Sequence, residues 1–259
     1  MGILNVTPDS FSDGGVHFDQ TRAIEAGMRM ASEGADVIDV GGESTRPGAS
    51  PVGGPEELER VLPVVKALVS RGIKVSVDTS KALVAEACLR AGAWMVNDVT
   101  ALGDPDMAAV CAKAGCDVCL MHMPGNPRTM QRNPVYADVV FEVGEYLLSR
   151  AAFAQSCGVA KARIWIDPGI GFGKTLEHNL TLLRHLDNFV ITGYKVLIGV
   201  SRKSFLGNIC REEALPVEDR LEATLAVQVL AQAKGVSCIR AHDVKEARRA
   251  LAAVDAVLN

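Results

Sequence analysis

The chain has 259 residues, 48% of them hydrophobic, which is enough to bury a large core. Its 27 Lys and Arg residues against 31 Asp and Glu give a formal charge of −4, which argues against a nucleic-acid partner held by bulk positive charge and favours small-molecule partners. No apolar run approaches the ~18 residues that span a bilayer, and no signal-peptide core is found, so we expect a soluble, cytoplasmic protein without a membrane partner.

Eight short apolar runs rich in β-formers alternate with longer helical patterns along the chain. The predicted strands are Gly2–Asn5, Asp36–Val40, Lys74–Asp78, Trp94–Asn97, Asp117–His122, Arg163–Asp167, Lys195–Ser201 and Cys238–His242. The predicted amphipathic helices include Thr21–Glu33, Pro55–Leu68, Lys81–Ala91, Asp138–Cys157 and Leu221–Ala233. Pro55 marks a helix start, whereas Pro63 should kink that helix or end it early.

Eight strand–helix repeats without a Pro/Gly/Ser-rich linker predict one α/β domain over residues 1–259, a single-domain (β/α)8 TIM barrel. An open doubly wound sheet is the alternative.

The seven cysteines are an odd set, which suits a reducing compartment better than a disulfide framework. "CAKAGCDVC" suggests a zinc cluster, but Cys111 lies in a helical pattern and Cys119 in a strand, so we expect packing cysteines instead.

Nearly every predicted strand ends on a polar or ionisable residue. These residues are Asn5, Glu43, Asp78, Asn97, His122, Asp167, Ser201 with Lys203, and Arg240 with His242. In a barrel the carboxyl ends of the strands meet on one face, where such enzymes place their chemistry. A strand-end polar group that is satisfied within the protein remains the alternative for each residue alone.

The segment "DPGIGFGKTL", Asp167 to Leu176, resembles two phosphate-binding motifs and satisfies neither. Pro168 stands where a Walker A loop needs its first glycine, and Lys174 stands where a dinucleotide fingerprint needs one. We expect the glycines to let a loop fold tightly over a site, with Phe172 supplying an apolar surface. A glycine-rich turn leading to a helix near His178 is an equal alternative.

Two kinds of ligand group are suggested by the strand ends. Inward-pointing Asp78, Asp167 and Asn97 suit a ligand rich in N–H donors, such as an aminopyrimidinone edge, whose carbonyl or ring nitrogen Lys203 could satisfy.

The second kind is a phosphate, because "SRKS" and "RAHD" place cations after strands seven and eight, where barrels often hold one. The amide oxygen of Asn5, on the adjacent first strand, could ligate a Mg²⁺ shared with that phosphate. A surface ion pair of Arg240 or His242 with Asp243 or Glu246 is the alternative.

Long segments of the chain resemble the dihydropteroate synthases, the pterin-binding (β/α)8 barrels of folate synthesis. They are "MGILNVTPDSFSDGG", "IDVGGESTRPGA", "VSVDTSK", "VNDVTAL", "LMHMPGNPRTMQ", "DPGIGFGKTLEHNL", "GVSRKSFLG" and "IRAHDVKEA", in the family order. The resemblance implies a transferase that joins 6-hydroxymethyl-7,8-dihydropterin diphosphate and 4-aminobenzoate to give 7,8-dihydropteroate and diphosphate. Sulfonamides, as aminobenzoate analogues, are expected to compete.

The resemblance also implies roles for individual residues. The pterin would be held by Thr45, Asp78, Asn97, Asp167 and Lys203. Diphosphate would be held by Asn5, Arg240 and His242, with Mg²⁺ on Asn5 as the metal cofactor. The 4-aminobenzoate site would be formed by Phe11, Thr45, Arg46, Pro47, Phe172, Lys203 and Ser204. The catalytic set would be Asp78, Asp167, Lys203, Arg240 and Asp9, with Asp9 organising the cationic pterin.

Two rival functions stay open. A pterin-barrel methyltransferase would share Asp78, Asn97 and Asp167 but has no need of cations for diphosphate, and a pterin-binding protein without turnover would keep the whole site.

Leu221–Ala233 is apolar around most of its circumference, which suggests a homodimer, as in relatives that pair through late helices. Close packing between neighbouring helices is the alternative.

Overall fold

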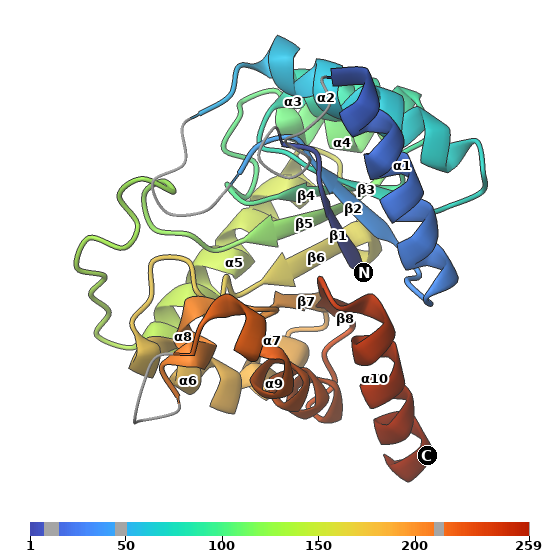
Figure 1. The fold of residues 1–259 in the computed structure, drawn as a ribbon. Coiled ribbons are helices and arrows are strands. Elements are labelled where there is room, and N and C mark those ends of the chain that lie inside the picture. The colour runs from blue at the N-terminus through green and yellow to red at the C-terminus, as the bar shows by residue number, and fades with distance from the viewer. Residues whose placement is uncertain (8–15, 45–50, 210–214, 259) are drawn as a thin grey trace.

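Eight parallel strands form one sheet in chain order (Figure 1). The computed structural model describes residues 1–7, 16–44, 51–209 and 215–258, and only the backbone of residues 16–19. The strands are β1 (Gly2–Asn5), β2 (Ile38–Gly41), β3 (Val75–Asp78), β4 (Met95–Asp98), β5 (Asp117–Met121), β6 (Ile164–Asp167), β7 (Lys195–Gly199) and β8 (Cys238–Arg240). Each predicted strand is present, and β5, β7 and β8 end one or two residues earlier than predicted, because the chain leaves the ladder before the last polar residues of those predictions.

Backbone hydrogen bonds between β8 and β1 close the sheet into a barrel. The Ile3 amide donates to the carbonyl of Ala241 at 3.0 Å, and the Ala241 amide donates to the carbonyl of Met1 at 3.0 Å. The amino group of Met1 donates to the Ile239 carbonyl at 2.9 Å. The predicted (β/α)8 barrel is therefore confirmed, and the open doubly wound sheet is excluded.

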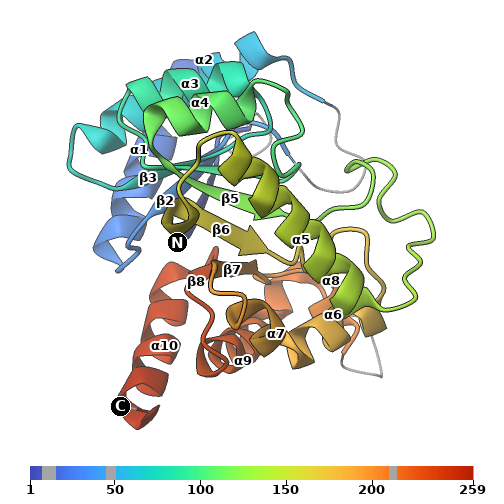
Figure 2. The ribbon, with the colours of Figure 1, turned by 180° about the vertical axis from the view of Figure 1, so that it is seen from behind.

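The helices lie around the outside of the strands, as the two opposite views show (Figures 1 and 2). They are α1 (Val16–Ser32), α2 (Gly54–Val69), α3 (Ala82–Arg90), α4 (Met107–Ala114), α5 (Val139–Ser156), α6 (Leu176–Arg184), α7 (Leu186–Val190), α8 (Ser204–Gly207), α9 (Leu221–Ala233) and α10 (Val244–Leu258). Among the described residues, no helix is both long and apolar enough to cross a membrane.

Pro63 does not end its helix, so that part of the prediction is wrong. Helix α2 continues six residues beyond it, to Val69. A proline leaves the carbonyl four residues earlier, here that of Glu59, without its usual helical donor. The side-chain amide of Gln20 donates to this carbonyl at 3.3 Å, so α1 supplies the hydrogen bond that Pro63 cannot make.

The apolar core has an outer and an inner part. Alternate strand residues such as Val77 and Ile198 are fully buried and pack outward against the helices, as the two-residue period of a strand requires. The inner part is a smaller cluster of Met95, Cys119 and Leu197 within the barrel.

The cysteines whose structure is described are free thiols, as expected, and no metal-binding group of three His, Cys, Asp or Glu side chains occurs in the described part of the chain.

Two tryptophans close the floor of the barrel, the end opposite the strands' carboxyl termini. Trp94 immediately precedes β4 and Trp165 is the second residue of β6, and their rings meet edge to face with centroids 5.9 Å apart. The Trp165 indole donates to Oδ2 of buried Asp117 at 2.8 Å, and Nζ of Lys195 lies 4.7 Å from the Trp165 ring. Aromatic and polar contacts thus fix this end in one geometry.

Replacing Trp165 by alanine should lower the free energy of unfolding by about 3–5 kcal/mol, because it removes a large inner side chain and leaves Asp117 short of a donor. Trp165→Phe should cost roughly 1–2 kcal/mol, since it keeps the ring contact and loses only the indole donor. Urea denaturation followed by circular dichroism checks both. Phe141→Ala, at an exposed aromatic, is the matched control and should leave the midpoint unchanged.

Candidate active site

An ion-pair network at the carboxyl ends of β2, β3 and β8 joins the two predicted ligand groups. Nη2 of Arg240 donates to Oδ2 of Asp78 at 2.8 Å, and Nε of Arg240 donates to Oδ2 of Asp39 at 2.6 Å. The Arg240 side chain is 20% exposed, Asp78 is 10% exposed, and Asp39 is fully buried. The cation expected to hold phosphate therefore contacts the carboxylate expected to hold the heterocycle.

The alternative of a surface ion pair for Arg240 is wrong. Asp243 instead accepts from exposed Arg202, whose Nε lies 2.9 Å from Oδ2. His242 is half-buried, and its backbone amide donates to Oγ of Ser201 at 3.1 Å, which links the ends of β7 and β8.

Asp39 was missed by sequence reasoning, which examined strand ends and not strand interiors. It lies in the middle of β2 between Ile38 and Val40, and its Oδ2 also accepts from Nδ2 of Asn97 at 3.0 Å. A carboxylate inside an apolar strand must be paired, because an unpaired buried charge is very costly. The pattern "VIDV" could therefore have identified it as a site residue.

The network perturbs its own protonation equilibria. Burial raises the pKa of Asp78 to about 7, although the nearby Arg240 guanidinium opposes this shift. Burial disfavours the charged form of Arg240, but Asp39 and Asp78 outweigh it and hold the pKa of Arg240 above its ordinary value. The site therefore contains a permanent cation beside a carboxyl group that titrates near neutrality.

The glycine loop after β6 forms the opposite side of the site. Oδ1 of Asp167 accepts from the Gly169 amide at 2.7 Å, and burial raises the pKa of Asp167 while Lys203 lowers it. Gly169 has φ +68°, and a Cβ there would lie 1.9 Å from the carbonyl oxygen of His122. The loop thus packs directly against the end of β5, and no side chain is tolerated at that contact.

Lys174 anchors this loop. The sequence marks Lys174 only as a mismatch to a dinucleotide-binding motif and does not predict this role. Its Nζ is buried, donates to the Phe172 carbonyl at 2.9 Å and lies 3.0 Å from Nδ1 of His122. Burial, followed by Lys174, lowers the pKa of His122 to about 3, so the neutral ring can accept this hydrogen bond. Burial also lowers the pKa of Lys174 to about 7.

The loop leads into α6, whose start is capped by Thr175 and His178, so the expected turn into a helix near His178 is confirmed. The fold of this loop over a site stays a prediction. Lys203 donates to the Ile170 carbonyl, and its Nζ lies 4.3 Å from the Phe172 ring centroid. Burial lowers the pKa of Lys203 to about 8, and Asp167 opposes the shift. Phe172 therefore faces a cation that Asp167 partly balances.

The remaining predicted residues divide into three sets. Asn5 is half-buried at the end of β1 and pairs in register with Gly41, and Ser204 is exposed at the start of α8. Glu43 is not part of the network, because it pairs with Lys81 and accepts from the Val52 amide at 2.9 Å. Outside the described residues lie Asp9, Phe11, Thr45, Arg46 and Pro47.

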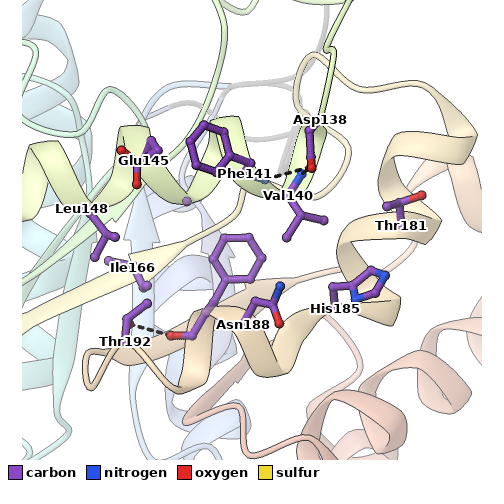
Figure 3. Close-up of a pocket in the computed structure, with 12 residues that line it drawn as sticks. Asp138, Val140, Phe141, Glu145, Leu148, Ile166, Thr181, His185, Asn188 and Thr192 are labelled. Carbon is purple, nitrogen blue, oxygen red and sulfur yellow. Dashed lines mark hydrogen bonds between the residues drawn. The ribbon is translucent and has the colours of Figure 1, made fainter.

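A cavity of about 540 Å³ lies elsewhere, on the outer ring between α5 and the pair α6–α7 (Figure 3). Two of its polar side chains serve local structure: Asp138 accepts from the amides of Val140 and Phe141, and the Thr192 hydroxyl donates to the carbonyl of Phe189. The titrating cluster at the barrel mouth is the better candidate for an active site.

Comparisons with known proteins agree with this choice. A family model described as "Pterin binding enzyme" matches residues 1–242. The chain is 46% identical to dihydropteroate synthase of Escherichia coli (strain K12), over all of this chain and 91% of that one. It superposes with a TM-score of 0.93 and 45% identity on a Yersinia pestis dihydropteroate synthase in a sulfonamide drug complex, covering 100% of this chain and 93% of the other. The Xanthomonas albilineans dihydropteroate synthase with 4-aminobenzoic acid gives the same score and identity, with 100% and 92% coverage.

Gly169→Ala should displace the loop from β5 and weaken ligand binding at the mouth by at least about 10-fold, since ~1 Å of misplacement can cost 10²-fold in rate. Gly72→Ala is the control, because Gly72 also has positive φ while a Cβ there meets no atom within 4 Å. It should show only the backbone cost of about 1–2 kcal/mol. Titration calorimetry and urea denaturation separate the two effects, and equal behaviour of both variants would contradict the assigned contact.

Proposed function

The chain belongs to the family of pterin-binding enzymes and is a transferase of the dihydropteroate synthase kind, and on this premise we propose how its residues perform the reaction. The substrates are 6-hydroxymethyl-7,8-dihydropterin diphosphate and 4-aminobenzoate, and the products are 7,8-dihydropteroate and diphosphate. The observation that carries the proposal is the meeting of Asp78, Asn97 and Arg240 in one network, with Asp167 and Lys203 at the same mouth.

The pterin is recognised by its N–H donors. Asp78 and Asp167 offer carboxylate oxygens, and Asn97 offers an amide, in surroundings where an unpaired polar group would be costly. Lys203 donates to the pterin carbonyl or ring nitrogen in place of the Ile170 carbonyl that it now contacts. The bond from Lys203 to the ligand thus replaces one that the protein makes with itself.

The leaving diphosphate lies against Arg240, His242 and Asn5. The side-chain oxygen of Asn5 is a hard donor suited to Mg²⁺, and the described residues contain no cluster of three acidic, His or Cys ligands to bind the ion by themselves. Asn5 would hold a Mg²⁺, and oxygen atoms of the substrate diphosphate would be further ligands suited to the ion. When bound, the ion supplies positive charge against the departing diphosphate.

Catalysis is mainly electrostatic in this proposal. The bond between the pterin methylene and the diphosphate oxygen breaks first, and the electron pair leaves with diphosphate. Asp78, Asp167 and Asp9 stabilise the pterin cation while Arg240 stabilises the anion, in an arrangement that needs little reorientation. The 4-aminobenzoate nitrogen then attacks the methylene carbon and loses a proton.

The amine substrate approaches from the loop side of the mouth. Phe172, Lys203 and Ser204 provide its described wall, and Phe11, Thr45, Arg46 and Pro47 are proposed to complete it. Sulfonamides should compete for the same position, since the related Yersinia pestis protein was crystallised with such a drug.

We also propose a cytoplasmic homodimer that pairs through α9. Leu230 on this helix is 62% exposed, and α10 covers another part of its surface. An exposed apolar side chain on a helix that already packs on one side favours a second partner. Sedimentation equilibrium of the wild type and Leu230→Glu measures the association directly.

Diphosphate release is the test that separates the synthase from its rivals. It should require Mg²⁺, the pterin diphosphate and 4-aminobenzoate together, and should yield dihydropteroate. A pterin-barrel methyltransferase would release no diphosphate, and a binding protein would bind pterin without turnover. Either result would overturn the proposal.

Asp78→Ala and Arg240→Ala should each lower kcat/KM by at least ~10²–10³, because each removes a charged contact that strengthens in the transition state. Steady-state release of diphosphate measures the loss. Asp187→Ala removes an exposed carboxylate that pairs with Lys234 and should retain wild-type rates. Near wild-type turnover of either site variant would remove that residue from the mechanism.

The pH profile of kcat/KM for the pterin substrate should be highest between about pH 7 and 8. Below about pH 7 Asp78 becomes protonated and loses its negative charge, and above about pH 8 Lys203 loses its proton. The residual activity of Asp78→Asn should lack the acidic limb, and Lys203→Arg should move the alkaline limb upward. Profiles of both variants with the same substrates cancel the titration of the substrates themselves.

A further inference from the structure

The partners of Asp39 are all residues of the candidate site. Its Oδ2 accepts from Arg240 and from Asn97, and its Oδ1 has no hydrogen-bond partner among the residues described. A fully buried carboxylate is costly unless it is paired, and the side-chain hydrogen bonds that Asp39 accepts within the described residues come from Arg240 and Asn97. Its position is therefore explained by the two groups that it holds.

Asp39 lies one layer deeper in the barrel than Asp78. In the β2–β3 register Gly41 pairs with Asp78, whereas Asp39 pairs with Ser76, two residues nearer the floor. Asp39 is fully buried while Asp78 retains some exposure at the mouth. A ligand entering from the mouth reaches Asp78 first and leaves the contact between Asp39 and Arg240 beneath it.

The two contacts of Arg240 therefore differ in kind. Its Nη2 contact with Asp78 occupies the carboxylate that the pterin needs, so this contact must be shared or given up when substrate binds. Its Nε contact with Asp39 lies below and can persist. A guanidinium can rotate about such an anchor and present its other N–H groups to phosphate.

Asp39 also determines which way the Asn97 amide faces. An ionised carboxylate only accepts hydrogen bonds, so the atom of Asn97 that faces it must be the NH₂ group. The carbonyl oxygen of Asn97 is then the atom left for the ligand. Asn97 would act as an acceptor for a pterin N–H, alongside the carboxylates.

We propose that Asp39 is a positioning residue: it anchors Arg240 through Nε while Nη2 exchanges Asp78 for substrate, and it presents the carbonyl oxygen of Asn97 to the pterin. This inference deepens the proposed function and rests on it for the identity of the ligands. Asp39 itself contacts neither substrate and acts through the two side chains above it.

The test uses Asp39→Asn, with Ser76→Ala as the matched control. Ser76 pairs with Asp39 in the sheet, is fully buried, and its hydroxyl also lacks a partner within the described residues. Asp39→Asn keeps the size of the side chain and removes its charge. Binding of inorganic diphosphate and of 6-hydroxymethylpterin by titration calorimetry needs no turnover, so it reports on Asp39 even if the proposed reaction fails.

Asp39→Asn should weaken binding of both probes by roughly 10-fold or more, because Arg240 and Asn97 each lose a charged partner. It should lower kcat/KM for the pterin substrate by about 10²-fold and leave the KM for 4-aminobenzoate unchanged. Ser76→Ala should match the wild type in all three measurements. Wild-type affinity of Asp39→Asn for both probes would overturn the proposal. A rise in the KM for 4-aminobenzoate as large as the loss in affinity for the probes would overturn it too.

Asp39→Glu covers the case in which the asparagine variant does not fold. It keeps the charge but moves the carboxylate by one methylene group. Relative to the wild type, it should therefore lose less affinity for diphosphate than for 6-hydroxymethylpterin. Equal losses for the two probes would indicate a general structural role and would contradict the positioning of Asn97. If the wild type binds both probes without releasing diphosphate, the proposed reaction fails while the role of Asp39 is still decided by binding.

Discussion

The contact of one guanidinium with two carboxylates, Arg240 with Asp39 and Asp78, is the constraint on which the rest of the site depends. It joins β8 to β2 and β3 across the interior of the barrel. Removing Arg240 would leave the buried carboxylates of Asp39 and Asp78 without their cation, and an uncompensated buried charge is strongly destabilising. The cluster is therefore better explained by the chemistry that it prepares than by stability.

The barrel interior is arranged in layers around this cluster. Below it lie the apolar residues Met95 and Leu197 and the tryptophan floor, which exclude water from one side. Above and beside it, the glycine loop places Asp167 close to Lys203. Charges held between an apolar floor and a shaped loop interact more strongly than they would in water, because the local dielectric is low. The fold thus supplies the preorganisation that the proposed dissociative reaction requires.

Periodicity was sufficient to predict the architecture. The eight strands and α9 were located because alternating and three- to four-residue patterns follow directly from backbone geometry. Pro63 was misjudged because the compensating donor, Gln20, comes from another helix. Side-chain partners across the barrel also escape local patterns, so the pairing of Arg240 with Asp78 could not be read from sequence. Asp39 and Lys174 are charges in apolar surroundings, but Asp39 does not stand at a strand end and Lys174 completes no phosphate-binding motif, so neither pattern predicts a role for them.

The position of the tryptophans has a consequence for spectroscopy. The chain contains two tryptophans, and both belong to the floor, in contact with each other and with lysine ammonium groups. Intrinsic indole emission therefore reports on the end of the barrel farthest from the proposed ligand site. A shift in the emission wavelength on adding substrate would indicate that binding at the mouth changes the surroundings of the indoles at the opposite end, and an unshifted spectrum would indicate that those surroundings stay the same.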